Sequence, residues 1–363
     1  MMSKNYSKYR TRIDSLSQTL NADQILLLST PTDIAYLTGF IHLVPEERES
    51  FLLVTPHTHL FFHASFSPFN IPSGIIANRG SALSKIEAAI QDFHQQNKIK
   101  ELLVDKSSLF VNEFEMLTKL SFLKVTGFDR QHIWNLRTIK DDQEIATLAN
   151  AAQITAQAME AAIDALQAGM TEIELRTIIE AQLRKLGSEK PAFPTIVAFG
   201  ANSALPHHQP TTVALQPEMA VLIDMGATIA GYHGDMTRTI WFGQKPDPEF
   251  LKIEAHVKNA YQTAVRVLKN RKVDQQILAK DLDQAARGVI SSAGYGEKFI
   301  HTTGHGLGLD LHENLSLNWN NTQKIRPQMV ITIEPGIYVE GRFGYRHENM
   351  ILVTTDDAQE LMK

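Results

Sequence analysis

The segment that decides the fold is Val221-Leu-Ile-Asp-Met-Gly-Ala-Thr-Ile-Ala-Gly-Tyr-His-Gly-Asp-Met-Thr-Arg-Thr-Ile-Trp-Phe242. Asp224 lies at the end of a buried-strand pattern, and Asp235 directly precedes another. The glycines between them predict that the two strands form a hairpin. Because a buried carboxylate without a partner is costly, we expect a positive group between the two acids. Pairing with Arg238, or exposure at the hairpin end, is the alternative.

The second half of the chain contains a similar arrangement. Glu334 ends the apolar run that starts at Met329, and Glu348 precedes the apolar run that ends at Val353. Between the two hairpins lies the glycine-rich segment His301-Thr-Thr-Gly-His-Gly-Leu-Gly-Leu-Asp-Leu-His-Glu313, where glycines permit close approach of the backbone. The sequence therefore offers two acids from each half and a histidine-bearing loop between them.

Such a set of side chains predicts a metal centre. Carboxylates and an imidazole gathered inside a sheet would repel one another as bare charges, whereas about two divalent cations would stabilise them. A pair of such ions activates water and polarises a carbonyl, so the implied reaction is metal-assisted hydrolysis. Taken one at a time, the Gly-His-Gly turn around His305, the Glu334-Pro-Gly segment and the pair His207-His208 would also fit ordinary surface loops.

The remaining patterns predict two domains. Residues 1–135 read as a smaller α/β domain, with strands over Gln24–Leu28, Phe51–Val54, His59–Phe62 and Glu101–Val104 and helices over Ser81–Gln96 and Asn112–Leu120. Its histidines, His42, His57, His59 and His63, have no spacing typical of a site, and we expect them on the surface.

Residues 136–363 read as two helices followed by strands, twice over. Capping boxes at Asp141-x-x-Glu144 and Thr171-x-x-Glu174 begin the first two helices, Asp247-Pro248 begins the third, and the fourth is predicted from Asp274 to Gly294. The predicted class is α+β, with two related halves whose strands join in one sheet.

Composition narrows the possible partners. The chain has 363 residues, a formal net charge of -5 and no basic run, so nucleic acid is not expected to bind. It contains no cysteine, so any metal ligands must be His, Asp or Glu, and a cytoplasmic location is expected. The polar N-terminus predicts no signal peptide, and no apolar run is long enough to predict a membrane span.

Taken together, these motifs resemble the pita-bread metallopeptidases, which include methionine aminopeptidase, aminopeptidase P, prolidase and the metal-free creatinase. The matching motifs are Pro206-His207, Asp224-x-Gly226, Gly231-Tyr-His-Gly-Asp-Met-Thr-Arg-Thr239, Gly304-His-Gly-Leu-Gly308, His312-Glu313, Ile333-Glu-Pro-Gly336 and Arg346-x-Glu348. The first domain is similar to the creatinase-like domain of the proline-specific branch, including Tyr36-Leu-Thr-Gly-Phe40. The resemblance implies a pseudo-twofold pita-bread catalytic domain over residues 136–363.

The resemblance also implies a role for each matching residue. Asp224 would bind one metal ion, Asp235 and Glu348 would bridge two, and His305 and Glu334 would complete the other. Glu334 would also shuttle a proton. His207 and His312 would hydrogen-bond the substrate or the tetrahedral intermediate, His301 would line the site, and Arg346 would organise it. Manganese is the expected metal, with cobalt and zinc as alternatives.

The expected activity is release of an N-terminal residue that precedes proline, by an Xaa-Pro aminopeptidase. An Xaa-Pro dipeptidase (prolidase) is the alternative, and a non-catalytic peptide-binding module of the same fold is a remote one. The implied partners are small peptides with proline at the second position and a second copy of the chain in a homodimer. His347, Asn349 and Gly234 depart from the family pattern, and the first two are expected to alter the charge around the metal ligands.

Overall fold

A computed structural model describes residues 3–41, 48, 50–64, 75–80, 83–271 and 275–362. Contacts divide the chain into two compact units, Met1–Arg137 and Thr138–Lys363. The domain boundary between residues 135 and 136 stays a prediction. The predicted His42 lies outside the described residues.

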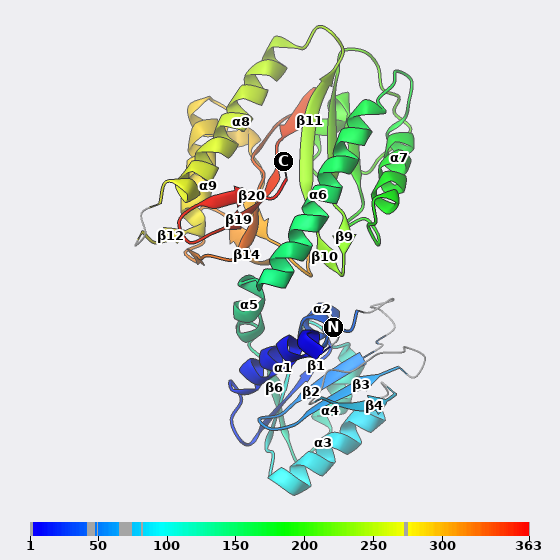
Figure 1. Ribbon diagram of the computed structural model, residues 1–363, viewed down its shortest axis with the longest axis vertical. Coiled ribbons are helices and arrows are strands. Elements are labelled where there is room, and N and C mark those ends of the chain that lie inside the picture. The colour runs from blue at the N-terminus through cyan, green and yellow to red at the C-terminus, as the bar shows by residue number, and fades with distance from the viewer. Residues whose placement is uncertain are drawn as a thin grey trace. The chain divides into compact units, whose positions relative to one another are not determined.

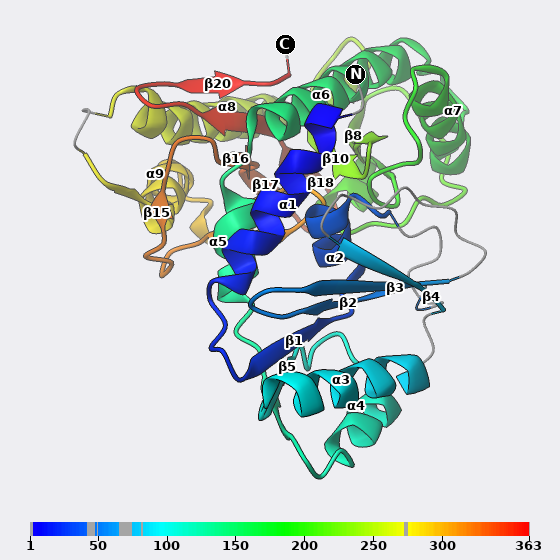
Figure 2. The ribbon, with the colours of Figure 1, turned by 60° about the horizontal axis from the view of Figure 1, so that its bottom comes forward.

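The first unit is a sheet of strands with helices on both faces, as Figure 2 shows. Its six-stranded sheet has the order β4-β3-β2-β1-β5-β6. The strands are β1 (Gln24–Leu28), β2 (Ser50–Val54), β3 (His59–His63), β4 (Ile75–Arg79), β5 (Glu101–Val104) and β6 (Lys124–Gly127), and the helices are α1 (Ser3–Ser17), α2 (Pro31–Thr38), α3 (Leu83–Asn97), α4 (Val111–Thr118) and α5 (Gln131–Thr138). The α/β layer is therefore confirmed, but the surface placement of His59 and His63 is wrong. Both are buried, because β3 lies between β2 and β4 inside the sheet.

Two helix pairs enclose the strands of the second unit (Figure 1). They are α6 (Asp142–Asp164) with α7 (Glu172–Lys185), and α8 (Pro248–Lys269) with α9 (Ala279–Ser292). Both predicted capping boxes form, since the Asp141 and Thr171 side chains accept from the backbone N–H groups of Glu144 and Glu174. The fourth helix begins at Ala279 rather than at residue 274, because Ile277 and Leu278 pair as a short strand with β15 (Lys324–Ile325).

The strands of the second unit form several sheets rather than the single sheet that the sequence predicted. The sheets that carry the site are three-stranded (β11-β8-β7), five-stranded (β14-β13-β16-β19-β20) and two-stranded (β17-β18). The site strands are β7 (Ile196–Phe199), β8 (Met219–Met225), β11 (Met236–Phe242), β13 (Gly304–Gly306), β14 (Glu313–Leu317), β16 (Val330–Ile333), β17 (Gly336–Val339), β18 (Phe343–Arg346), β19 (Asn349–Val353) and β20 (Ala358–Glu360). Where β11 meets β18, the Thr239 hydroxyl donates to the carbonyl oxygen of Arg346 and accepts from its backbone N–H. The two strands are therefore linked there through a side chain rather than by a backbone ladder.

Each helix pair packs on its own strands. The first apolar core joins α6 and α7 to β7, β8 and β11, and includes Leu148, Ile179 and Ile223. The second joins α8 and α9 to β16 and β19, and includes Ile253 and Ile351. The predicted helix, helix, strands repeat is thus present, and the polar strand ends lie between the two cores.

Candidate active site

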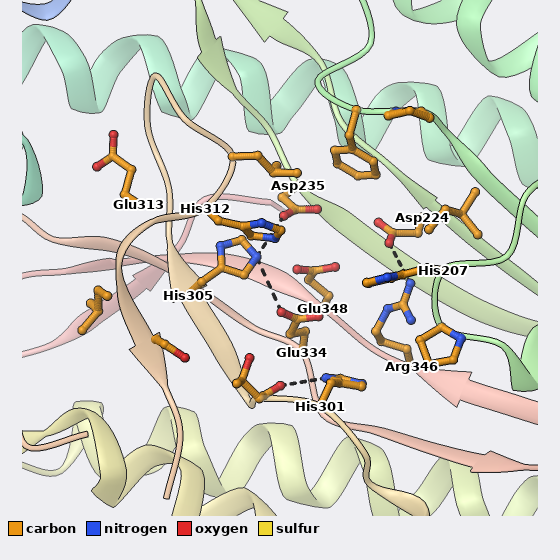
Figure 3. A pocket seen from close by; sticks show the side chains of 18 of the residues that line it. His207, Asp224, Asp235, His301, His305, His312, Glu313, Glu334, Arg346 and Glu348 are labelled. Carbon is orange, nitrogen blue, oxygen red and sulfur yellow. Dashed lines mark hydrogen bonds and ion pairs between the residues drawn. The ribbon is translucent and has the colours of Figure 1, made fainter. Parts of the chain in front are cut away.

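The acidic residues of both halves lie at strand ends. In the first hairpin, Met225 of β8 pairs with Met236 of β11, which brings Asp224 and Asp235 to the same end of that ladder. In the second, Ile333 of β16 pairs with Asn349 of β19, so Glu334 and Glu348 flank a matching end. Figure 3 shows the four carboxylates directed into one pocket.

His305 joins the two pairs of acids. Its Nε2 lies 3.5 Å from Asp235 Oδ2 and 3.6 Å from Glu334 Oε1. Ligand atoms of Asp235, His305 and Glu348 lie within 4.8 Å of one another, as metal ligands do. His305 Nδ1 lies 3.2 Å from the carbonyl oxygen of Gly306, which can only accept. Nδ1 therefore carries the proton and Nε2 presents its lone pair to the carboxylates.

The electrostatics of the cluster show that these charges are not compensated by protein groups alone. Burial raises the pKa of Asp235 well above its usual range, and Glu348 and Asp224 raise it further. Burial likewise raises the pKa of Glu334 to about 8 and that of Glu348 well above its usual range. Burial lowers the pKa of His305 to about 3, so its imidazole is neutral. Without cations these acids must retain protons, which is the behaviour expected of ligands that share a metal.

Asp224 provides a direct test of whether the residues fit such ions. Its Oδ2 accepts from Arg346 Nη2 at 2.7 Å, whereas Arg238, the partner in one of the two alternatives, donates to Glu348 and Asn349. Its buried Oδ1 has no hydrogen-bond partner among the described residues. A buried orphan oxygen beside carboxylates and a neutral imidazole is a donor set suited to a divalent ion.

Arg346 connects the two halves of the site. Its Nε donates to Thr237 Oγ1 at 3.0 Å, and Thr237 donates in turn to Glu348 Oε2 at 2.7 Å. Its Nη1 donates to the hydroxyl of Tyr338 at 2.8 Å. A single buried guanidinium therefore fixes Asp224 directly and Glu348 through Thr237.

His301 faces Tyr338 rather than the acids. His301 Nδ1 lies 2.7 Å from the carbonyl oxygen of Thr302 and therefore donates to it. Its Nε2, 2.8 Å from the Tyr338 hydroxyl, is the acceptor of that hydrogen bond. Burial lowers the pKa of His301 to about 3, which keeps the ring in this neutral form.

The cluster opens into a cavity of about 650 Å³ whose walls include His207, His312, Phe193, Pro194 and Leu315. The His312 ring lies edge-on to His305, with centroids 4.2 Å apart, and Figure 3 shows both near the carboxylates. His207 is exposed to the cavity, whereas the next residue, His208, is buried. All nine residues predicted for the site thus line one cavity.

Sequence reasoning missed several contributing side chains. Neither Thr237 nor Tyr338 was assigned a role in the site, although a buried tyrosine hydroxyl signals a polar partner. The buried ion pair between Lys140 Nζ and Glu313 Oε2, 2.8 Å long, was also missed. Glu313 follows His312, so this pair fixes the end of the histidine-bearing loop.

Comparison with known proteins agrees with this geometry. The sequence pattern of metallopeptidase family M24 matches residues 146–355. The chain belongs to metallopeptidase family M24. An uncharacterized peptidase of Staphylococcus saprophyticus is 32% identical over 359 residues, covering 96% of this chain and 98% of the relative. M24 membership implies that this protein is a peptidase and binds divalent metal ions.

Solved structures show the same fold over nearly the whole length. An Xaa-Pro dipeptidase from Bacillus anthracis has a TM-score of 0.89 and 28% identity, covering 98% of both chains. An X-Pro aminopeptidase from Thermotoga maritima has a TM-score of 0.83 and 28% identity, covering 96% of this chain and 97% of that one. The M24 protein thus has the pita-bread fold, and its similarity is to the proline-specific branch, which confirms the resemblance drawn from its motifs. Within the described part of the chain, every helix is too short or too polar to cross a membrane.

Proposed function

We propose that this M24 protein is a dinuclear metal-dependent Xaa-Pro aminopeptidase, which releases an N-terminal residue that precedes proline. The observation that carries the proposal is the convergence of Asp235, His305 and Glu348 within 4.8 Å in a cavity of peptide size. The similarity in fold to Xaa-Pro peptidases supports the proline preference. General peptidases that grip the scissile N–H fail at an X-Pro bond because proline has none.

The proposed ligands are Asp224 for one ion, Asp235 and Glu348 between two ions, and His305 and Glu334 for the other. When bound, such ions lower the pKa of water and polarise a carbonyl. Manganese is proposed, with cobalt and zinc as alternatives. The buried Oδ1 of Asp224, which has no hydrogen-bond partner among the described residues, and Nε2 of the neutral His305 ring support this assignment, because both atoms can coordinate a metal ion.

The protein's own groups would move the protons and bind the substrate. Glu334 would accept the proton of the attacking water at a carboxylate oxygen and pass it to the proline nitrogen, which leaves as an amine. His207 and His312 would donate to the carbonyl oxygen as negative charge develops on it. His301 would hold Tyr338, and Arg346 would hold Asp224 and Glu348 in register.

The charge of the cavity bears on substrate length. A dipeptide presents a free proline carboxylate next to the scissile bond, which calls for a cation in the site. Among the described residues lining the cavity, Arg346 is the only Arg or Lys, and its guanidinium is already bound to Asp224, Tyr338 and Thr237. This supports cleavage of longer peptides over dipeptides. An Xaa-Pro dipeptidase is the second candidate, favoured by the similarity to the enzyme from Bacillus anthracis.

The deciding experiment compares Ala-Pro with Ala-Pro-Ala after loading the protein with manganese, cobalt or zinc, with Ala-Ala-Ala as the control for proline preference. We expect Ala-Pro-Ala to be cleaved best and Ala-Ala-Ala least. Glu334→Ala should abolish hydrolysis while the circular dichroism spectrum stays unchanged. Equal cleavage of all three peptides would exclude proline preference, and full activity of Glu334→Ala would exclude the assigned mechanism. Absence of both metal and activity would favour a binding module.

We also propose that the protein is cytoplasmic and forms a homodimer. The absence of cysteine from the sequence supports the first. The second comes from the resemblance of the sequence to the family. Sedimentation equilibrium would test the homodimer, and fractionation of cells that express the protein would test its location.

A further inference from the structure

The loop that carries His207 is bound by one buried carboxylate, Glu172, which is not among the proposed metal ligands. Residues 200–211, here called the His207 loop, follow β7 and begin with a short 3₁₀ turn, Gly200–Ala204. Glu172, the first residue of α7, has a fully buried side chain directed at this loop.

Both oxygens of Glu172 accept hydrogen bonds from the loop or from Phe199, the residue directly before it. Oε1 accepts from the backbone N–H of Phe199 at 2.8 Å and from Asn202 Nδ2 at 2.9 Å. Oε2 accepts from the N–H and hydroxyl of Thr211, at 2.8 and 2.7 Å, and from His208 Nε2 at 2.8 Å. The carboxylate therefore binds the start, the middle and the end of the loop.

Glu172 is ionised in this arrangement. Burial by itself would raise its pKa, but the hydrogen bonds from Asn202, His208 and Thr211 outweigh burial, and the pKa of Glu172 is lowered. An ionised carboxylate can only accept, so His208 must carry its proton on Nε2. Charge-assisted bonds of this kind are about twice as strong as neutral ones.

The loop has a second attachment in the opposite half of the unit. Gly344 of β18 donates its N–H to Ser203 Oγ at 2.9 Å. A side chain at residue 344 would place its Cβ 2.1 Å from the carbonyl oxygen of Ser203, so glycine alone permits this contact. The same strand carries Arg346, which binds Asp224. The position of the loop is therefore fixed relative to the proposed metal ligands as well as to α7.

We propose that Glu172 and His208 are positioning residues, which form a clamp that holds His207 toward the substrate carbonyl. This inference rests on the proposed function of His207. The two adjacent histidines have different surroundings. His208 is buried against Glu172, whereas His207 is exposed to the cavity. Release of the clamp would displace His207 without touching a metal ligand.

The test uses Glu172→Gln with Glu174→Gln as its matched control. Glu174 lies on the same helical turn and is exposed, and its partner among the described residues is Thr171 in the capping box, so its substitution changes the helix end but not the loop. Glu172→Gln puts an amide N–H against the donors of the loop. Because a displacement of about 1 Å costs up to about a hundredfold in rate, we expect Glu172→Gln to lower kcat/KM for Ala-Pro-Ala by up to that factor and Glu174→Gln to leave it unchanged.

A double-variant cycle separates positioning from general damage. If Glu172 acts through His207, the variant Glu172→Gln/His207→Ala will be no slower than His207→Ala alone, with bound metal unchanged. His208→Gln, which retains a donor near the position of Nε2, should keep most activity, whereas His208→Leu should match Glu172→Gln. Multiplying effects in the double variant, or equal activity of His208→Gln and His208→Leu, would overturn the proposal.

Chemical modification reports on the clamp without requiring activity. Diethyl pyrocarbonate should modify His207 but spare the buried His208 in the wild-type protein and in Glu174→Gln, and modify both in Glu172→Gln. Continued protection of His208 in Glu172→Gln would exclude the clamp. Should the wild-type protein cleave none of the peptides, the proposed function fails, while the modification pattern still decides whether Glu172 holds the loop.

Discussion

The side-chain amide of Asn349, the residue that follows the proposed metal ligand Glu348, donates to Glu360 Oε2 at 2.9 Å. Its oxygen accepts from Arg238 Nη2 at 2.7 Å, and Arg238 also donates to the backbone carbonyl of Glu348. Asn349 therefore uses both ends of its amide, since the oxygen accepts from Arg238 and the nitrogen donates to Glu360 and to the Tyr261 hydroxyl. An aspartate here could still accept from Arg238 but would oppose the carboxylate of Glu360.

Asn349→Asp should consequently destabilise the protein and weaken metal binding. Two acceptors would face each other in a buried site, at a cost of about 1–3 kcal/mol. Adding Glu360→Gln should restore stability, because the amide introduced at residue 360 can donate to the carboxylate introduced at residue 349. Thermal unfolding and metal titration of the single and double variants provide the measurement. A single variant as stable as the wild-type protein would contradict this explanation of the departure from the family pattern.

Stability of the metal-free protein should fall as pH rises from about 7.5 to about 8.5. Burial lowers the folded-state pKa of His301 and of His305 to about 3, so below about pH 7.5 these rings take up protons only in the unfolded chain, and the carboxyls govern the slope above that pH. Burial raises the folded-state pKa of Glu334 to about 8, and those of Asp235 and Glu348 well above their usual range. The folded protein then holds protons that the unfolded chain has released, so each retained proton lowers stability by up to about 1.4 kcal/mol per pH unit.

Calorimetry of the chelated protein across this window checks the slope. Addition of divalent metal should raise Tm more at about pH 8.5 than at about pH 7.5, with release of protons, because the ions replace them. Glu334→Gln should show a shallower decline. A Tm that rises from about pH 7.5 to about pH 8.5 without metal would contradict the electrostatic account.

Gly304→Ala should abolish metal binding and lower Tm. A Cβ at residue 304 would lie 2.1 Å from the carbonyl oxygen of Thr332, so β13 would have to move and carry His305 with it. Gly288→Ala is the matched control, because a Cβ there meets open space and alanine favours the interior of α9 by about 0.5–1 kcal/mol. Metal content and Tm of both variants give the result, and metal retained by Gly304→Ala would show that β13 tolerates the shift.

Lys140→Met should be more damaging than replacement of both members of its ion pair. Lys140 and Glu313 have side chains only 2% and 4% exposed, so loss of the cation leaves a buried negative charge beside His312. Removing one partner of a buried pair costs about 3–5 kcal/mol, whereas Lys140→Met/Glu313→Leu replaces both charges with apolar groups. Tm should therefore recover in the double variant. Equal Tm values for the single and double variants would contradict the claim that the buried charge of Glu313 destabilises Lys140→Met.

The sequence predicted the parts of the site that local patterns encode. The four acids follow or precede apolar strand runs, and glycines such as Gly304 signal close backbone contacts, so the ligand set could be read in order along the chain. Both capping boxes are contained within four residues and were equally readable.

Features that depend on distant pairing could not be predicted. The start of α9 is displaced because Ile277 pairs with Ile325. Tyr338 and Thr237 belong to the site because Arg346, which is distant from Thr237 in the sequence, donates a hydrogen bond to each of them. Glu172 was assigned no role from the sequence, because its contacts depend on residues 199–211 folding back over it.

The proposed metal ligands come from both halves of the second unit, which also affects how the protein is made. Asp224 and Asp235 belong to the first hairpin, while Glu334 and Glu348 belong to the second. A ribosome must therefore translate beyond Glu348 before any nascent chain can assemble the proposed centre. Incomplete products that end before Glu348 would lack one of the proposed ligands and should therefore not hydrolyse peptides.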